Sequence, residues 1–189
     1  MGGVPPDVIL NFKNKEYAIC KQKCENIMIS EPKNCIALIY LGHIAESEKD
    51  YETSIKYYKK VTEIEPRFPF IWSRIGEIFK EQEKFSEALD AFVEEIAIYN
   101  EKAAPWCMAS MCASKIGRHD LAVGILRLAQ EKVEDDGQSI ISYSLGIMEE
   151  VAGNNDEALV SYIQGQLSSK DDEIKNRSAK QIYNLLTKK

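Results

Sequence analysis

A spacing of 34 residues that recurs along the chain is the feature that most restricts how it can fold. Leu38, Trp72 and Trp106 follow one another at this interval. The same interval relates further small, aromatic and aliphatic positions: Gly42 and Gly76; Ser54, Ala88 and Ala122; Tyr58, Phe92 and Leu126. A period of this length is typical of repeat proteins, in which similar modules stack on one another. The chain is therefore expected to be an array of modules.

The fifth copy of the pattern is displaced by two residues. Gly146 lies 36 residues beyond Ser110, and two further pairs show the same offset: Ala158 after Ala122, and Tyr162 after Leu126. A loop accommodates additional residues at a lower free-energy cost than a packed helix face. We therefore expect the insertion in the polar stretch 134–138.

Each module is predicted to contain two short amphipathic helices. The stretch WSRIGEIFKEQEKFSEALDAF, residues 72–92, has a turn signal at Glu83-Lys84 between two helical patterns. A large residue followed four positions later by a small one alternates bulk and gap, so that the second helix can approach closely at Ala88. One module cannot bury its apolar face alone, which means that neighbours must stack.

These positions resemble the tetratricopeptide repeat family, whose unit of about 34 residues reads W-x2-L-G-x2-Y, then A-x3-F, then P. The clearest copies are Leu38-x2-Leu41-Gly42-x2-Ala45 with Ser54-x3-Tyr58 and Pro66, and Trp72-x2-Ile75-Gly76-x2-Phe79 with Ala88-x3-Phe92. The resemblance covers about residues 8–169. It implies an all-α, right-handed solenoid of stacked antiparallel helix pairs.

The chain departs from the family pattern at three places. Ser110 replaces the Gly of the fourth unit, Asn100 replaces the Pro of the third, and Ser142 replaces the large residue of the fifth.

The expected divisions are a partial first unit at 1–34, units at 35–68 and 69–102, a unit with the loop insertion at 103–138, a unit at 139–169, and a C-terminal capping helix at 170–189.

The capping helix is predicted from its own pattern. Residues 169–172, Ser-Lys-Asp-Asp, fit a capping box at a helix start. A single apolar stripe follows on a Lys-rich helix, made of Ile174, Ile182, Leu185 and Leu186. Because the N-terminal end has no equivalent helix, we expect the chain to be part of a longer protein.

No residue is predicted to do reaction chemistry or to hold a metal or a cofactor. Cys20 and Cys24 are four apart, but the repeat places them at packing positions, where Cys acts as a small hydrophobic residue. Only His43 and His119 are available to complete a metal site. Phosphate-binding, zinc-protease and hydrolase motifs are absent from the sequence, so we predict a protein that is not an enzyme.

Composition and charge restrict the partners and the compartment. The chain has 24 Lys and Arg against 30 Asp and Glu, a net charge of −6, which opposes nucleic-acid binding. No apolar run is long enough to cross a membrane, and none follows a charged start as in a secretory signal. Five scattered cysteines suit a reducing compartment, which predicts a cytoplasmic or nuclear protein.

The resemblance also implies a concave groove, lined by the first helix of each unit, that binds a protein or peptide partner. Its predicted lining is Ile36, Ile39, Tyr40, His43, Phe70, Arg74, Glu77, Met108, Met111, Tyr143 and Ile147, with Ser73, Cys107 and Ser144 beside them. Apolar residues exposed in a row favour a partner. The alternative is that several of them are half-buried and complete the core.

Some family members hold a chaperone's C-terminal carboxylate with a clamp of Lys, Asn, Asn, Lys and Arg. If Arg74 is the clamp's Arg, then Phe70 and Tyr40 stand at the second Lys and second Asn, and Pro5 and Ile9 at the first pair. The clamp is therefore absent. A different hypothesis is that the array is an architectural spacer or a self-associating segment that acts through its ends or its convex face.

Overall fold

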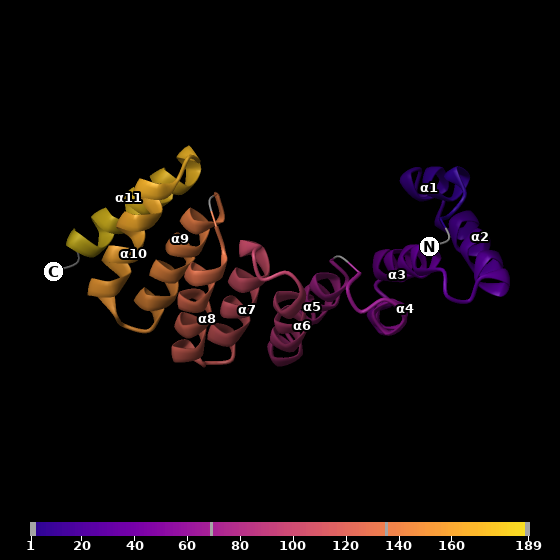
Figure 1. Ribbon diagram of the computed structural model, residues 1–189, viewed down its shortest axis with the longest axis horizontal. Coiled ribbons are helices and arrows are strands. Elements are labelled where there is room, and N and C mark those ends of the chain that lie inside the picture. Colours follow the sequence, from indigo (N-terminus) through magenta and orange to yellow (C-terminus); the bar gives the residue numbers. More distant parts are fainter. Residues whose placement is uncertain (1–2, 69, 135, 188–189) are drawn as a thin grey trace. The chain divides into compact units, whose positions relative to one another are not determined.

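The chain is all-α. The computed structural model describes residues 3–68, 70–134 and 136–187, and within these ranges it contains helices and no strand (Figure 1). The helices are α1 (Pro6–Lys13), α2 (Tyr17–Ser30), α3 (Cys35–Ser47), α4 (Tyr51–Ile64), α5 (Ile71–Glu81), α6 (Phe85–Ile98), α7 (Ala103–Lys115), α8 (His119–Lys132), α9 (Asp136–Val151), α10 (Asn155–Ser168) and α11 (Asp172–Thr187). The predicted all-α helical repeat fold is confirmed.

The helices form two compact units, which are described separately. Unit 1 runs from the N-terminus to Ile78, and unit 2 from Phe79 to the C-terminus, so that the division falls within α5. In unit 1, α1 packs on α2, α2 on α3 and α3 on α4. In unit 2, α6 packs on α7, α7 on α8 and α9, α8 on α9, and α10 on both α9 and α11.

The core of unit 1 contains Val8, Cys20, Cys24, Ala37, Leu41 and Ile44. Asn34 begins α3, because its side-chain oxygen accepts a hydrogen bond from the Ala37 amide at 3.0 Å. Asp50 caps α4 in the same way, accepting from the Thr53 amide at 3.1 Å. Such caps satisfy amides that have no partner within the helix.

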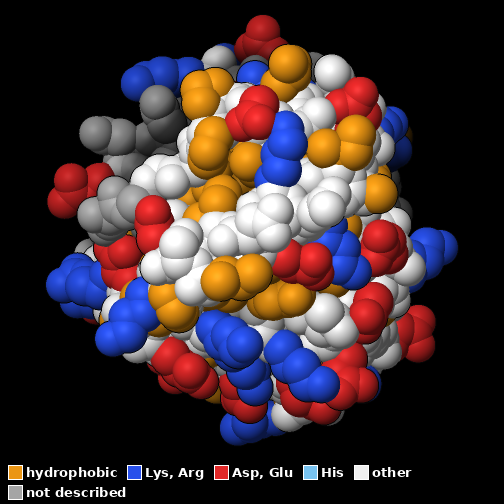
Figure 2. All heavy atoms as spheres, turned by 90° about the vertical axis from the view of Figure 1, so that its right-hand side faces the viewer, with side chains coloured by type: hydrophobic (Ala, Val, Ile, Leu, Met, Phe, Trp, Pro, Cys, Tyr) orange, Lys and Arg blue, Asp and Glu red, His pale blue; other side chains and the backbone are white. Residues whose placement is uncertain are grey.

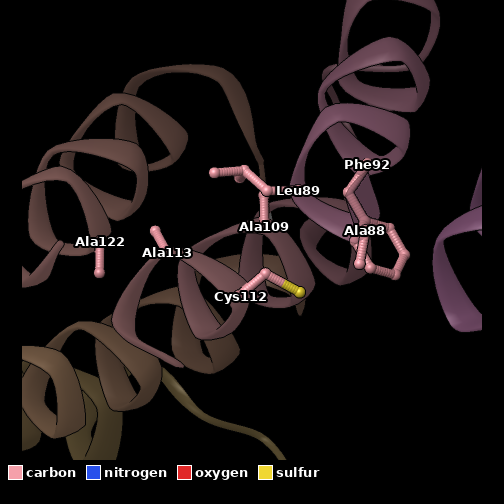
Figure 3. Packing of buried hydrophobic residues seen from close by; sticks show 7 residues of the cluster. All are labelled: Ala88, Leu89, Phe92, Ala109, Cys112, Ala113 and Ala122. Carbon is pink, nitrogen blue, oxygen red and sulfur yellow. The ribbon is translucent and has the colours of Figure 1, made fainter. Parts of the chain in front are cut away.

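One core cluster of unit 2, formed by α6, α7 and α8, is built largely from small residues. Figure 3 shows Ala88, Leu89 and Phe92 of α6 facing α7, with Ala122 of α8 on its other side. The α7 members of this cluster are Ala109, Cys112 and Ala113. Short side chains allow helix axes to approach closely, so that the aromatic and Leu side chains fill the remaining space.

The turn inside each helix pair uses one repeat position in a left-handed conformation. The residues with positive φ at this position are Lys15 (61°), Lys49 (61°), Glu83 (58°), Gly117 (78°) and Gly153 (86°). Glycine adopts this conformation freely, whereas a residue with a Cβ is strained in it by about 1 kcal/mol. The turn predicted at Glu83-Lys84 is confirmed.

Two glycines of the repeat pattern are required by a tyrosine ring. A Cβ added to Gly42 of α3 would lie 2.5 Å from Cε1 of Tyr58, and one added to Gly146 of α9 would lie 2.6 Å from Cδ1 of Tyr162. Both tyrosine side chains are fully buried. The prediction that these glycines act as spacers is therefore confirmed.

The predicted packing positions are buried. Ser54, Ala88, Ala122 and Ala158 have no exposed surface, and neither do Cys20, Cys24, Tyr58, Leu126 and Tyr162. The interpretation of Cys20 and Cys24 as small core residues is confirmed. Burial raises the pKa of the Cys24 thiol to about 12 and also raises that of Cys20, so both thiols stay protonated.

Part of the stretch 134–138, which was predicted to hold the two-residue insertion as a loop, is helical. The connection after α8 is short, and α9 begins at Asp136, so Gly137 and Gln138 are helical. Additional residues at the free N-terminal end of a helix lengthen it without changing the register of the positions that follow. Gln138 also helps to end α8, because its amide nitrogen donates to the Gln130 carbonyl at 2.8 Å.

The predicted start of the C-terminal helix also needs correction. Asp171 caps α11, because its carboxylate accepts from the Glu173 amide at 2.8 Å. Ser169 instead forms a small turn with Asp171, in which its hydroxyl accepts from the Asp171 amide at 3.0 Å. Leu186, which was expected in the buried stripe, is 61% exposed, whereas Ser178 is the buried residue of α11.

The surface carries both signs of charge. Lys, Arg, Asp and Glu side chains are interspersed over the face shown in Figure 2, with hydrophobic side chains in small groups between them. Among the described residues, none of the helices combines the length and the apolar composition that a membrane-crossing segment needs.

Candidate functional site

The residues predicted to line a groove lie on the first helix of each pair, with one exception. They are Ile36, Ile39, Tyr40 and His43 on α3; Arg74 and Glu77 on α5; Met108 and Met111 on α7; Tyr143 and Ile147 on α9. All ten side chains are half-buried. They are therefore neither core residues nor fully solvated ones.

Phe70 is the exception. It precedes α5, has a φ of 66° and is 56% exposed. Its carbonyl accepts a hydrogen bond from the Arg74 amide at 3.0 Å, so it stands at the start of the helix. The prediction that Phe70 lies on the first helix is wrong, because α5 begins one residue later.

Aromatic rings gather on one side of unit 1. The Phe12 ring of α1 lies 5.0 Å from that of Tyr40, edge to face, and 5.9 Å from that of His43. His43 in turn lies 5.6 Å from the Tyr58 ring. Edge-to-face contacts stabilise aromatic pairs, and these connect α1, α3 and α4. Phe12, Tyr40 and His43 are half-buried, so they form an aromatic surface.

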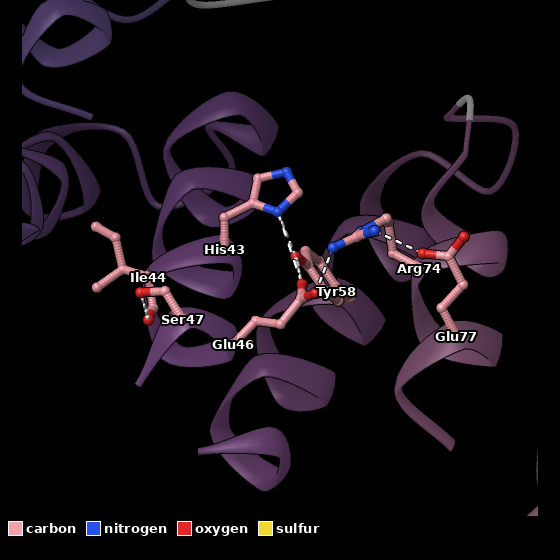
Figure 4. A network of polar contacts seen from close by, with 7 residues as sticks. All are labelled: His43, Ile44, Glu46, Ser47, Tyr58, Arg74 and Glu77. Atoms are coloured by element: carbon pink, nitrogen blue, oxygen red, sulfur yellow. Dashed lines mark hydrogen bonds and ion pairs between the residues drawn. The ribbon is translucent and has the colours of Figure 1, made fainter. Parts of the chain in front are cut away.

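A polar network continues from this aromatic surface (Figure 4). The Tyr58 hydroxyl donates to Oε2 of Glu46 at 2.9 Å and lies 2.8 Å from Nδ1 of His43. A hydroxyl has one hydrogen, so Nδ1 of His43 donates to Tyr58. Arg74 of α5 forms an ion pair with Oε1 of Glu46 and another, at 2.5 Å, with Glu77.

The network determines the charge state of Glu46. Burial alone would raise the pKa of this carboxyl, but the nearby His43 Nδ1, 3.7 Å from Oε2, together with the hydrogen bond and charge of Arg74, outweighs burial and lowers the pKa to about 2. Glu46 is therefore ionised throughout the physiological range. The Arg74 guanidinium is shared by two carboxylates, which leaves this site with a net negative charge.

Unit 2 brings together a second set of predicted residues. Met108 accepts a weak hydrogen bond from Nζ of Lys80, with Nζ 3.8 Å from its sulfur. The Cys107 thiol lies 3.3 Å from the Ser144 hydroxyl, which links α7 to α9. The Tyr143 ring lies 5.7 Å from that of Tyr162, whose hydroxyl donates to Glu150 at 3.1 Å.

These surfaces present aromatic, thioether and paired charged groups. Within the described residues, no group of three or more His, Cys, Asp or Glu side chains is arranged to hold a metal ion. Burial raises the pKa of the Cys107 thiol, which disfavours the nucleophilic thiolate. Aromatic edges, a thioether and paired charges interact by packing and by hydrogen bonds.

Three residues of these sites were not predicted from the sequence. Phe12 lies in the incomplete first unit, where the repeat gave no position for it. Glu46 and Tyr58 could have been found, since Glu46 follows Gly42 by one helical turn and a tyrosine at a packing position needs a partner for its hydroxyl.

A family model agrees with this geometry. Residues 37–68, which contain most of α3 and all of α4, match the tetratricopeptide repeat model. Residues 37–68 are therefore similar to one tetratricopeptide repeat. The family resemblance that the 34-residue spacing predicted is confirmed.

Curated and solved relatives extend the comparison. The uncharacterized protein ycf37 of Cyanophora paradoxa is 32% identical over 97 residues, which are 48% of this chain and 55% of that protein. The chain therefore spans about half the length of this relative.

Three solved structures share the helical repeat fold. MamA superposes with a TM-score of 0.69 at 17% identity, over 92% of this chain and 90% of MamA. TTC0263 of Thermus thermophilus gives 0.58 at 16% identity, over 93% and 95%. YrrB, described as a TPR protein with an unusual peptide-binding site, gives 0.61 at 17% identity, over 88% and 85%. At these identities the likeness concerns the fold.

Proposed function

We propose that this chain is a non-enzymatic protein-interaction module that binds a peptide segment of a partner within a larger assembly. The surface formed by the first helices carries the binding. The observation that supports this most directly is that ten of the predicted groove residues are half-buried on these helices. Solved relatives with this fold include YrrB, with its peptide-binding site.

In the proposed binding, the aromatic surface and the charged side chains have different roles. The aromatic surface of Phe12, Tyr40 and His43 offers apolar area with little side-chain freedom to lose. Arg74 is already paired with Glu46 and Glu77, so it is not available as a clamp for a partner's carboxylate. A positively charged group of the partner pairs instead with Glu77, the outer of the two carboxylates.

The proposal is tested by quantitative affinity capture from cell extract with folded variants. Phe70→Asp and Glu77→Lys alter exposed parts of the proposed surface of unit 1. Each is expected to reduce recovery of at least one partner about tenfold, since interface anchors contribute about 1 kcal/mol or more. Ile29→Asp, at an 80% exposed position on α2, is the matched control and should leave recovery unchanged. An identical partner set in all four proteins would contradict the proposal.

Self-association is the second candidate, and exposed apolar residues of α11 favour it. Tyr183 is 68% exposed and Leu186 is 61% exposed on this helix. An architectural segment that joined copies through this end would show a mass that rises with protein concentration in light scattering. Tyr183→Lys should abolish the rise if α11 makes the contact.

A further inference from the structure

A groove separate from these first-helix surfaces lies in unit 2 between α8 and α10. Both helices pack against α9, which forms the base between them (Figure 1). Two hollows of about 500 and 490 Å³ occur here, and both are lined by Gln130 of α8 and Gln164 of α10. Because they share these residues, the two hollows lie next to each other, and together they are called the groove.

One end of the groove is charged. Glu149 of α9 is buried at its base and accepts hydrogen bonds from Arg127 of α8 at 3.0 Å and from Ser161 of α10 at 2.7 Å. These bonds hold the three helices together. Glu157 lines the same end, whereas Glu131 follows Gln130 on α8 and lies at the middle of the groove. With one cation against three carboxylates, the lining as a whole has a net charge of −2.

The middle of the groove presents side-chain amides. Gln130 is half-buried and Gln164 is exposed, one on each wall. Within the described part of the chain, no hydrogen bond joins either side-chain amide to another residue. A glutamine amide offers both a donor and an acceptor, which matches the C=O and N–H of a peptide backbone.

The other end of the groove is uncharged and contains an exposed leucine. Leu167 of α10 is 80% exposed there, beside Ser168 and the α9 residues Gln138 and Ser142. An apolar side chain of a ligand would remove the Leu167 surface from water, at a gain of about 25 cal/mol per Å² of area buried.

The length of the groove sets how many residues of an extended ligand it can hold. Glu157 and Leu167 are ten residues apart on α10, which corresponds to about 15 Å along a helix. An extended chain advances about 3.3 Å per residue, so about five residues span this distance.

We infer that the groove between α8 and α10 binds an extended segment of about five residues from another protein. A basic side chain lies near Glu157, the backbone pairs with Gln130 and Gln164, and an apolar side chain contacts Leu167. The net negative charge of the lining disfavours a nucleic acid. The groove is independent of the first-helix surfaces, so either proposal can fail alone.

The test uses two peptides blocked at both ends, Lys-Ala-Ala-Ala-Leu and Leu-Ala-Ala-Ala-Lys, which present the same pattern in opposite chain directions. Each is titrated into the whole chain labelled with ¹⁵N, and the side-chain amide signals of Gln130 and Gln164 are followed by NMR. At least one peptide is expected to shift both signals in a saturable way. The peptide with Glu in place of Lys should bind at least about fivefold more weakly, because its charge is reversed at the acidic end.

Variants assign the response to the groove. Gln130→Ala with Gln164→Ala, followed through the backbone amide signals of α8 and α10, should weaken binding about thirtyfold, because each of the two lost hydrogen bonds contributes about 1 kcal/mol. Glu157→Gln should weaken it about threefold, with less effect at high salt. Glu77→Lys, on a first helix, should not change it. The inference is overturned if neither peptide shifts the two signals, if the Glu peptide binds equally well, or if the double variant binds as the wild type does.

Discussion

The surroundings of Tyr58 in unit 1 and of Tyr162 in unit 2 are two versions of one arrangement. Each tyrosine packs against a glycine of the preceding helix and donates its hydroxyl to a glutamate four residues after that glycine, Glu46 or Glu150. Around Tyr58 the network also contains His43 and the ion pair with Arg74, whereas Tyr162 contacts the Tyr143 ring. The shared part is local to one helix pair, while the ion pair requires a residue from the next helix.

The largest expected difference concerns the charge of Glu46. Its pKa, about 2, lies below the usual value of 4.5, so ionised Glu46 stabilises the fold above about pH 5, and this contribution is lost as the pH falls toward 2. Full loss corresponds to about 3 kcal/mol. Glu46→Gln should remove this part of the pH dependence in urea unfolding measured from pH 7 to 3.

The exposed Glu63 provides the control for this experiment. Glu63→Gln should follow the wild-type curve. If Glu46→Gln also followed the wild-type curve, the ion pair with Arg74 would not contribute to the pH dependence of stability, and this difference between the two regions would be refuted.

The glycines test the part that the two regions share. Gly42→Ala and Gly146→Ala should each cost about 2 kcal/mol, since the added methyl group would overlap a buried tyrosine ring. Gly124 of α8 has no atom within 4 Å of an added Cβ, so Gly124→Ala should gain up to about 1 kcal/mol. Thermal unfolding measures all three, and unequal losses for Gly42 and Gly146 would separate the two regions.

The core of the fold was predictable because its determinants are close in sequence. Gly42 and Tyr58 contact each other within one helix pair. Gly146 and Tyr162 are the equivalent repeat positions and make the same contact. The conformation of the insertion was not predicted, because the spacing locates added residues between two repeat positions without distinguishing a loop from a longer helix, here α9.

The candidate sites were less predictable, for a different physical reason. The repeat gives the face on which Tyr40 and Arg74 lie, but not which side chains reach them. The Tyr40 ring contacts that of Phe12 on α1, whose copy of the repeat pattern is incomplete. Arg74 pairs with Glu46, which is 28 residues away in the sequence. Phe70 was misplaced because the 34-residue spacing gives equivalent positions in the repeat but does not give the residue at which each helix begins.

Removing the two hydroxyl groups compares the networks directly. Tyr58→Phe should cost about 1.5 kcal/mol, because the Tyr58 hydroxyl bonds both His43 and Glu46. Tyr162→Phe should cost about 1 kcal/mol, since its hydroxyl bonds Glu150. Urea unfolding at pH 7 gives both values, and a larger cost for Tyr162 would reverse the proposed order.

The smallest effects are expected in the turns that follow the two glutamates. Lys49 and Gly153 occupy the same left-handed turn position in the two regions. Lys49→Gly should change stability by only about 0.5 kcal/mol, because relief of strain is offset by the flexibility of glycine when unfolded. Gly153→Ala should cost about 1 kcal/mol. Matching thermal shifts from the two substitutions would show that strain does not differ between these turns.

The five free thiols give each unit its own reporter of opening. Cys20, Cys24 and Cys35 lie in unit 1, and Cys107 and Cys112 in unit 2. An alkylating reagent reaches a buried sulfur only when the surrounding helices separate. The modification rates of the four buried cysteines, Cys20, Cys24, Cys35 and Cys112, therefore measure how often their own neighbourhoods open. Mass spectrometry of the native chain can therefore record local unfolding along the array without any engineered label.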